Sequence, residues 1–188
     1  IALEAKNGDS LMLVSPSDHI ITDLEKFRAT VEAAIPTAND GQIVTFGIRP
    51  DRAETGYGWL ELSSKLSDNF ASVAQPLSSF VEKPDAETAD FLLRGGMHLW
   101  NAGIFLFSTS NILTSFEQYA PQTLAEVRNA FSGADIDLGF TRLAAEPLSR
   151  LEDISIDYAV MEHASNLSVM PYSGYWSDLG DWQAIWRE

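Results

Sequence analysis

Short apolar runs separated by turn-forming residues recur along the chain and predict strands. Leu11–Val14 ends at the turn formers Ser15–His19, as is typical of a strand buried on both faces of a parallel sheet. Ile43–Ile48 is rich in β-branched residues and predicts a second strand, and Ile104–Phe107 is so apolar that it predicts a central one. Three further strands are predicted, at Tyr57–Leu62, Ser79–Glu82 and Leu167–Met170.

Apolar residues at helical spacing predict amphipathic helices between these strands. The first spans Leu24–Ile35, with Thr22 or Asp23 as its N-cap and Pro36 just past its end. Because it connects the strands at 11–14 and 43–48, we expect a right-handed βαβ unit with parallel strands. The other predicted helices lie at 86–93, ending at Gly95-Gly96, and at 124–131, 154–161 and 181–187. This alternation indicates one α/β domain with a mixed sheet.

Composition narrows the function classes. The chain has 188 residues, 45% of them hydrophobic, and its 12 Lys+Arg against 27 Asp+Glu give a formal charge of -15. Such an acidic surface repels nucleic-acid polymers and anionic membranes, whereas a bound cation could still admit a small phosphorylated metabolite. There are no cysteines, which excludes disulfides and thiolate chemistry. Without a long apolar run or a signal-like start, we expect a cytoplasmic protein without membrane contacts.

Two carboxylates stand where a metal site could form. Asp18 follows the predicted strand at 11–14, and ligands of open α/β sheets bind beyond the carboxyl ends of strands. It could hold Mg²⁺, or it could cap the turn with His19 packed nearby. Asp178 lies between Trp176 and Trp182, and it is either a helix cap or a second metal carboxylate.

Three other segments offer groups for a ligand. The glycines of Glu54–Gly58 would let a ligand approach the backbone closely, although the segment could equally be a turn. Glu82 and Lys83 are neighbours on a predicted strand, so they should point to opposite faces rather than form an ion pair. Lys83 could bind phosphate from a cleft edge or be a solvated strand end. Asn101, just before the strand at 104–107, could bind a sugar or satisfy local backbone groups.

Taken in order, seven segments resemble the sugar-1-phosphate nucleotidyltransferases, and most closely their mannose-1-phosphate guanylyltransferase branch. The segments span nearly the whole chain at spacings like those of the family. They are Leu13–His19, Thr45–Pro50, Glu54–Gly58, Phe80–Pro84, Trp100–Phe105, Ile156–Glu162 and Trp176–Gly180.

The resemblance implies a fold and a reaction. The fold is a Rossmann-like, glycosyltransferase-A-like α/β domain whose mixed, mostly parallel sheet is flanked by helices. In the reaction, a phosphate oxygen of mannose 1-phosphate attacks the α-phosphorus of GTP in line, which gives GDP-mannose and pyrophosphate. Such chemistry depends on positioning and on charge neutralisation.

The resemblance also implies roles for particular residues. Asp18 and Asp178 would coordinate Mg²⁺, and Lys83 would neutralise the sugar phosphate. Glu82 would hold sugar hydroxyls and Tyr57 would shape the pocket wall. The other expected substrate-binding residues are Glu54, Gly58, Asn101 and Gly103, with Gly58 and Asn101 contacting mannose, and Asp157, which either contacts ligand or caps a helix.

One departure from the family pattern limits these expectations. Members open with a strand and a Gly-rich loop that carries an Arg and then a Lys, and this sequence begins beyond that point. We therefore expect residues 1–188 to form a domain that lacks its first strands, is inactive alone and self-associates through a bare apolar sheet edge. Two alternatives stay open: a nucleotidyltransferase for another sugar or nucleotide, and a catalytically silent regulatory relative that acts through subunit contacts.

Overall fold

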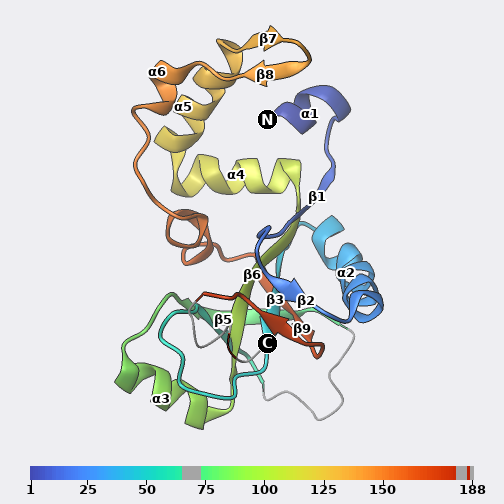
Figure 1. Ribbon diagram of the computed structural model, residues 1–188, viewed down its shortest axis with the longest axis vertical. Helices are drawn as coiled ribbons and strands as arrows, with labels where there is room; N and C mark the ends of the chain where they lie inside the picture. Colours follow the sequence, from blue (N-terminus) through green and yellow to red (C-terminus); the bar gives the residue numbers. More distant parts are fainter. Residues whose placement is uncertain (65–72, 181–185, 187–188) are drawn as a thin grey trace. The chain divides into compact units, whose positions relative to one another are not determined.

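The computed structural model describes residues 1–64, 73–180 and 186 (Figure 1). The chain divides into two compact units. The first unit combines Ile1–Ser10 with Ser108–Ser165. The second unit combines Leu11–Phe107 with the chain from Asn166 onward, and it holds nearly all of the predicted site residues.

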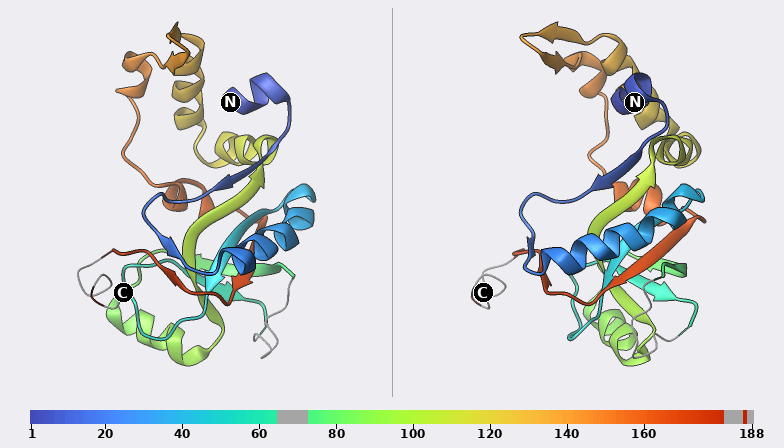
Figure 2. Two further views of the ribbon diagram at one scale, coloured as in Figure 1. Left: turned by 45° about the vertical axis from the view of Figure 1, so that its right-hand side comes forward. Right: turned by 90° about the vertical axis from the view of Figure 1, so that its right-hand side faces the viewer.

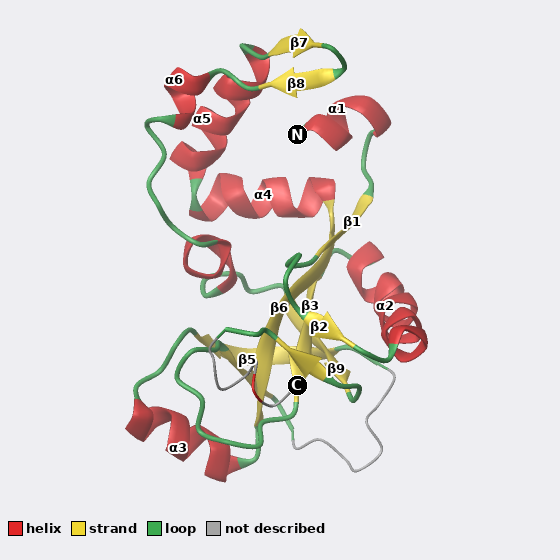
Figure 3. Cartoon of the chain, in the orientation of Figure 1, coloured by secondary structure: helices red, strands yellow, loops and turns green. Residues whose placement is uncertain are grey.

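The first unit is mainly helical (Figure 3). Helix α4 packs against α1, α5 and η1, and α5 packs against α6. The Asp9 carboxylate caps α4 by accepting hydrogen bonds from the Thr109 hydroxyl and from the Ser110 N–H and hydroxyl. The elements of this unit are α1 (Ala2–Asn7), α4 (Thr109–Tyr119), α5 (Pro121–Ser132), β7 (Asp135–Asp137), β8 (Phe140–Arg142), α6 (Ala145–Leu148) and the π-helical turn η1 (Asp157–Met161).

The second unit is built on a six-stranded sheet. Its strands, in spatial order, are β1 (Leu11–Val14), β6 (His98–Ser108), β3 (Ile43–Ile48), β9 (Leu167–Tyr172), β5 (Gln75–Val81) and β4 (Trp59–Leu62). β4 also pairs with β6, so five of these strands form a closed circuit of pairings. A separate two-stranded ladder joins β2 (Ile20–Ile21) to β10 (Trp176–Ser177).

The sheet is mixed, as predicted, but the prediction of a mostly parallel sheet was wrong. β3 and β9 pair in parallel, from Ile43 opposite Leu167 to Ile48 opposite Tyr172. The pairs β3–β6, β4–β5, β4–β6 and β5–β9 are all antiparallel. The long β6 lies between β1 and β3, so the two strands of the expected βαβ unit are not neighbours. β4 and β5, for example, are consecutive among the described strands and pair antiparallel.

Two helices, α2 (Leu24–Asn39) and α3 (Ala86–Gly95), flank this sheet, which confirms the α/β class (Figure 2). α2 lies along β3 and β9 and buries Ala34 and Ala38 against Phe46 and Met170. It continues past Pro36, where it was predicted to end, and its last turn buries Ala38.

α3 confirms its prediction more closely. It buries Ala89 and Leu92 against Trp59 and Trp100. Gly96 follows it at φ 64°, the left-handed conformation expected of a glycine at the end of a helix.

Strand β1 is exposed, although it was predicted to be buried on both faces. Leu13 is 45% exposed and Val14 is 39% exposed. β1 lies at the end of the strand order and borders only β6 among the strands described, so apolar composition alone did not predict its burial. By contrast, β3 and β9, which were predicted as strands, are buried almost throughout.

The remaining helix predictions have mixed outcomes. The helix at 124–131 is confirmed by α5, whereas the one at 154–161 is reduced to η1, and Ile154 is 42% exposed. α4 was not predicted. The helix at 181–187 falls mostly outside the described residues. In the part of the chain that is described, no helix is long and apolar enough to cross a membrane.

Candidate functional site

The β2–β10 ladder brings the two predicted metal carboxylates to one end of a strand pair. The strands run antiparallel, with Ile20 opposite Ser177. Asp18 precedes β2 and Asp178 follows β10, so both leave the ladder at the same end. His19 strengthens this pairing, because its Nδ1 accepts a hydrogen bond from Trp176 Nε1 at 3.3 Å. The sequence placed these acids in separate motifs, and the ladder joins them.

The Asp178 side chain is held in place, whereas Asp18 is exposed. The Tyr57 hydroxyl donates a hydrogen bond to Asp178 Oδ1 at 2.6 Å. Burial, together with this contact to a carboxylate, raises the pKa of Tyr57, so the phenol stays protonated and remains a donor. Leu179 has φ 52°, a left-handed conformation that is uncommon for a residue other than glycine, directly after the carboxylate.

The two carboxylates have donor atoms of the kind that Mg²⁺ prefers. Among the described residues, no group of three or more His, Cys, Asp or Glu side chains could enclose a metal ion. Mg²⁺ usually takes one or two protein carboxylates and completes its shell with water and substrate phosphates. The donor set of Asp18 and Asp178 therefore matches this ion, and it does not match a site built entirely from protein ligands.

Arg52 anchors the loop that carries Tyr57. Its Nε donates to Glu54 Oε2 at 3.0 Å, and its guanidinium lies 4.7 Å from the centroid of the Trp100 ring. The other oxygen of Glu54 accepts the Gly56 N–H at 3.0 Å. Glu54, predicted to bind substrate, is thus part of an internal clamp. Arg52 lies in none of the segments singled out from the sequence, and its position two residues before Glu54 was the available signal.

Gly58, Glu82 and Lys83 come together beside this loop. A Cβ atom on Gly58 would lie 2.5 Å from Glu82 Oε2, so only glycine leaves room for this carboxylate as it lies. The side chain of Glu82 is 8% exposed and that of Lys83 is 57% exposed. The Lys83 N–H donates to the carbonyl of Tyr57 at 3.3 Å, which links Lys83 to the loop that carries Tyr57.

The expectation that Glu82 and Lys83 point to opposite faces was wrong. Lys83 Nζ lies 3.6 Å from Glu82 Oε1, and the two form an ion pair. Lys83 has φ 45°, and it lies beyond the end of β5 at Val81. The alternation of side chains holds only along an extended strand, so the left-handed turn at Lys83 ends it.

Asn101 and Gly103 lie inside β6 rather than before the strand. The Asn101 side-chain oxygen accepts hydrogen bonds from the Thr45 hydroxyl at 2.7 Å and from the Gly103 N–H at 3.2 Å. Its backbone N–H donates to the Gly58 carbonyl at 2.7 Å. Asn101 is 8% exposed. The Asn101 oxygen therefore satisfies groups within the sheet, which was the alternative to sugar binding. The Asn101 backbone N–H also positions Gly58.

Gly103 has φ 68°, and a Cβ atom there would lie 3.8 Å from Pro16 and 3.9 Å from His19. It thus packs against the segment that carries Asp18. Asp157 belongs to the first unit, in the first turn of η1, where an acidic residue is favourable. Its role as a ligand or as a capping residue stays a prediction.

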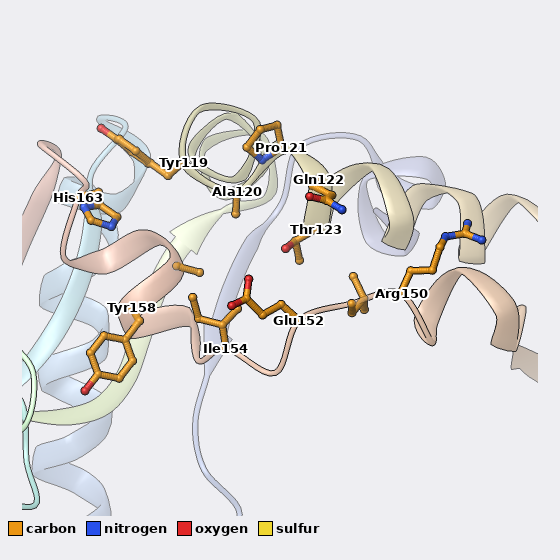
Figure 4. A pocket seen from close by; sticks show the side chains of 12 residues that line it. Tyr119, Ala120, Pro121, Gln122, Thr123, Arg150, Glu152, Ile154, Tyr158 and His163 are labelled. Carbon is orange, nitrogen blue, oxygen red and sulfur yellow. The ribbon is translucent and has the colours of Figure 1, made fainter.

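The first unit contains a cavity of about 410 Å³ that the sequence did not predict (Figure 4). Its lining comes from the junction of α4 and α5 and from the segment between Arg150 and His163. Arg150, its one arginine, forms ion pairs with Glu126 and Glu146. Its charge is therefore neutralised within the protein, and we assign the cavity no ligand.

Comparison with known proteins finds curated relatives that match most of this chain. A mannose-1-phosphate guanylyltransferase of Sinorhizobium fredii is 42% identical over 179 residues, which are 95% of this chain and 34% of that protein. The Escherichia coli protein of the same name is 41% identical over 99% of this chain and 40% of its own length. This chain thus spans well under half of the curated relatives that it matches.

Solved structures agree on the fold. A Thermus thermophilus protein described as mannose-1-phosphate geranyltransferase matches with a TM-score of 0.82 and 31% identity, over 99% of this chain and 51% of that one. A Helicobacter pylori protein described as mannose-6-phosphate isomerase matches with a TM-score of 0.81 and 28% identity, over 94% and 67%. The sequence model of the nucleotidyl transferase family matches residues 1–188. The chain therefore belongs to the nucleotidyl transferase family.

Proposed function

We propose that this chain carries the sugar-phosphate and metal part of a mannose-1-phosphate guanylyltransferase site. One observation carries the proposal: Asp18 and Asp178 leave the β2–β10 ladder at the same end, and Tyr57 links Asp178 to the group formed by Gly58, Glu82 and Lys83. The relatives named mannose-1-phosphate guanylyltransferase support the choice of substrates.

In the proposed reaction, a phosphate oxygen of mannose 1-phosphate forms a bond to the α-phosphorus of GTP. The bond from that phosphorus to the bridging oxygen breaks, and pyrophosphate leaves with the electron pair. Lys83, with 57% of its side chain exposed, would neutralise the sugar phosphate, and Glu82 would accept hydrogen bonds from sugar hydroxyls. These residues orient the nucleophile, and they require no covalent intermediate.

Asp18 and Asp178 would hold Mg²⁺, which supplies positive charge for the phosphates when it is bound. Tyr57 would keep Asp178 in place, and Gly58 would let the sugar approach the backbone beside Glu82. A cytoplasmic location and the use of GTP rather than another nucleotide belong to the same proposal and stay predictions.

Calorimetric titration of mannose 1-phosphate in the presence of Mg²⁺ tests this proposal. We expect Lys83→Gln to weaken binding ten- to a hundredfold, because a hydrogen bond to a charged group contributes about 1.5–3 kcal/mol. Lys26→Gln on α2, which removes an exposed lysine paired with Asp23, is the matched control and should bind normally.

Other results would favour the alternatives. Tighter binding of glucose 1-phosphate than of mannose 1-phosphate would indicate a relative with another sugar. A wild-type protein that binds neither sugar phosphate would contradict the proposed enzyme site and favour the catalytically silent relative.

A further inference from the structure

Both oxygens of the Asp178 carboxylate are constrained by other residues. Oδ1 accepts the short hydrogen bond of 2.6 Å from the Tyr57 hydroxyl. Oδ2 lies so close to Gly180 that a Cβ atom there would be 2.5 Å away from it. One oxygen of the carboxylate thus lies beside Gly180, and the other is held by the phenol of Tyr57.

The backbone between these residues has an unusual conformation. Leu179, between Asp178 and Gly180, has φ 52°, and its N–H donates to Ser177 Oγ at 3.3 Å. Gly180 itself is not among the residues with positive φ. Its backbone therefore does not require glycine, and the contact with Oδ2 is the observed reason why a side chain would not fit.

Tyr57 is well suited to hold a partner in a fixed place. Its ring makes edge-on contacts with Trp100 and Trp176, each with 5.3 Å between ring centroids. Its carbonyl accepts the Lys83 N–H, so the backbone is tied as well as the ring. A ring with two torsion angles that is packed on both sides keeps its hydroxyl at one point.

We propose that Tyr57 and Gly180 are positioning residues that set the orientation of Asp178 for a divalent cation, an inference that rests on the proposed function. Tyr57 holds Oδ1 by its hydrogen bond, and the absence of a side chain at Gly180 leaves room for Oδ2. This gives Tyr57 a role that is distinct from forming the wall of a sugar pocket. Groups that orient a metal ligand typically change metal affinity by ten- to a hundredfold when they are removed.

The test is a titration of the 188-residue protein with Mn²⁺, with the free ion followed by electron paramagnetic resonance. We expect Tyr57→Phe and Gly180→Ala each to weaken Mn²⁺ binding about tenfold or more. Thermal unfolding of the same samples checks the fold. Because the nearest described atoms to the Gly180→Ala methyl group belong to the end of the Asp178 side chain, that variant should unfold at nearly the wild-type temperature even if Tyr57→Phe does not.

Two matched controls are available. Tyr172→Phe removes a hydroxyl that donates to the carbonyl of Asp23 at 3.3 Å, and Gly95→Ala adds a methyl group in α3 that would meet no described side chain within 4 Å. Both should bind Mn²⁺ as the wild type does.

A further variant, Asp178→Asn, separates this inference from the proposed function. If Asp178→Asn abolishes Mn²⁺ binding while Tyr57→Phe and Gly180→Ala both bind normally, the metal site stands and the positioning role is wrong. If Asp178→Asn binds as the wild type does, or if the wild type does not bind Mn²⁺, the proposed metal role fails and the positioning role fails with it.

Discussion

Two residues of the site, Lys83 and Leu179, have left-handed backbone conformations, at φ 45° and 52°. For residues other than glycine such conformations cost roughly 1–3 kcal/mol each, and they persist only where the surrounding structure enforces them. Lys83 is enforced by its ion pair with Glu82 and by its backbone bond to Tyr57. Leu179 is enforced by Ser177. Both strained conformations lie next to a carboxylate of the proposed site. The backbone strain therefore occurs where functional side chains are oriented.

At this scale we predict that Gly58→Ala weakens mannose 1-phosphate binding about tenfold. The new methyl group would meet Glu82 Oε2 at 2.5 Å and push the carboxylate away from the sugar, which loses a charged hydrogen bond. The measurement is the calorimetric titration described above, with Gly95→Ala as the control. Unchanged affinity would show that the orientation of Glu82 does not matter for the sugar.

At the scale of elements, the strand β3 depends on a glycine in the core. A Cβ atom on Gly47 would lie 2.6 Å from both Leu99 and Val169, and both of those side chains are fully buried. The β3–β6 register also shifts between Thr45 and Gly47. The glycine thus lets β6 and β9 approach β3 closely where the sheet is irregular.

We therefore predict that Gly47→Ala lowers the free energy of unfolding by about 1–3 kcal/mol, the usual cost of overpacking a core. Urea unfolding followed by circular dichroism measures the change. Gly95→Ala again provides the comparison, since its methyl group meets no described side chain within 4 Å. A Gly47→Ala protein as stable as the wild type would mean that Leu99 and Val169 move apart freely.

The elements show what could be predicted from the sequence and what could not. Local patterns correctly placed β3, β9, α3 and α5, because apolar periodicity and end signals such as Gly96 act over a few residues. They did not predict the antiparallel position of β6 or the exposure of β1, because both depend on which strands become neighbours.

The same reason explains the candidate site. Separate motifs named its residues one by one, and the resemblance supplied the roles that stay predictions. The contact between Tyr57 and Asp178 and the clamp around Arg52 join residues through folded geometry, so no local pattern reveals them.

On the scale of the whole molecule, the exposed apolar strand β1 leads us to predict self-association. Leu11, Leu13 and Val14 are 36%, 45% and 39% exposed, and β1 borders only β6 among the described strands of the sheet. An uncovered apolar edge strand is a template for pairing with another copy.

We predict that Leu13→Lys shifts the protein toward the monomer, because a charged side chain on an edge strand opposes pairing. Light scattering over a range of protein concentrations measures the average mass. A wild-type protein that is monomeric throughout the range would contradict the prediction.

The β2–β10 ladder has a further consequence for how the chain holds together. It has two residues in each strand and joins segments from opposite ends of the sequence. An ion shared by Asp18 and Asp178 would act as a removable cross-link across that junction. Its binding free energy would then contribute both to phosphate binding and to the association of the β2 and β10 segments. Substrate binding and the association of these two segments would therefore be thermodynamically linked.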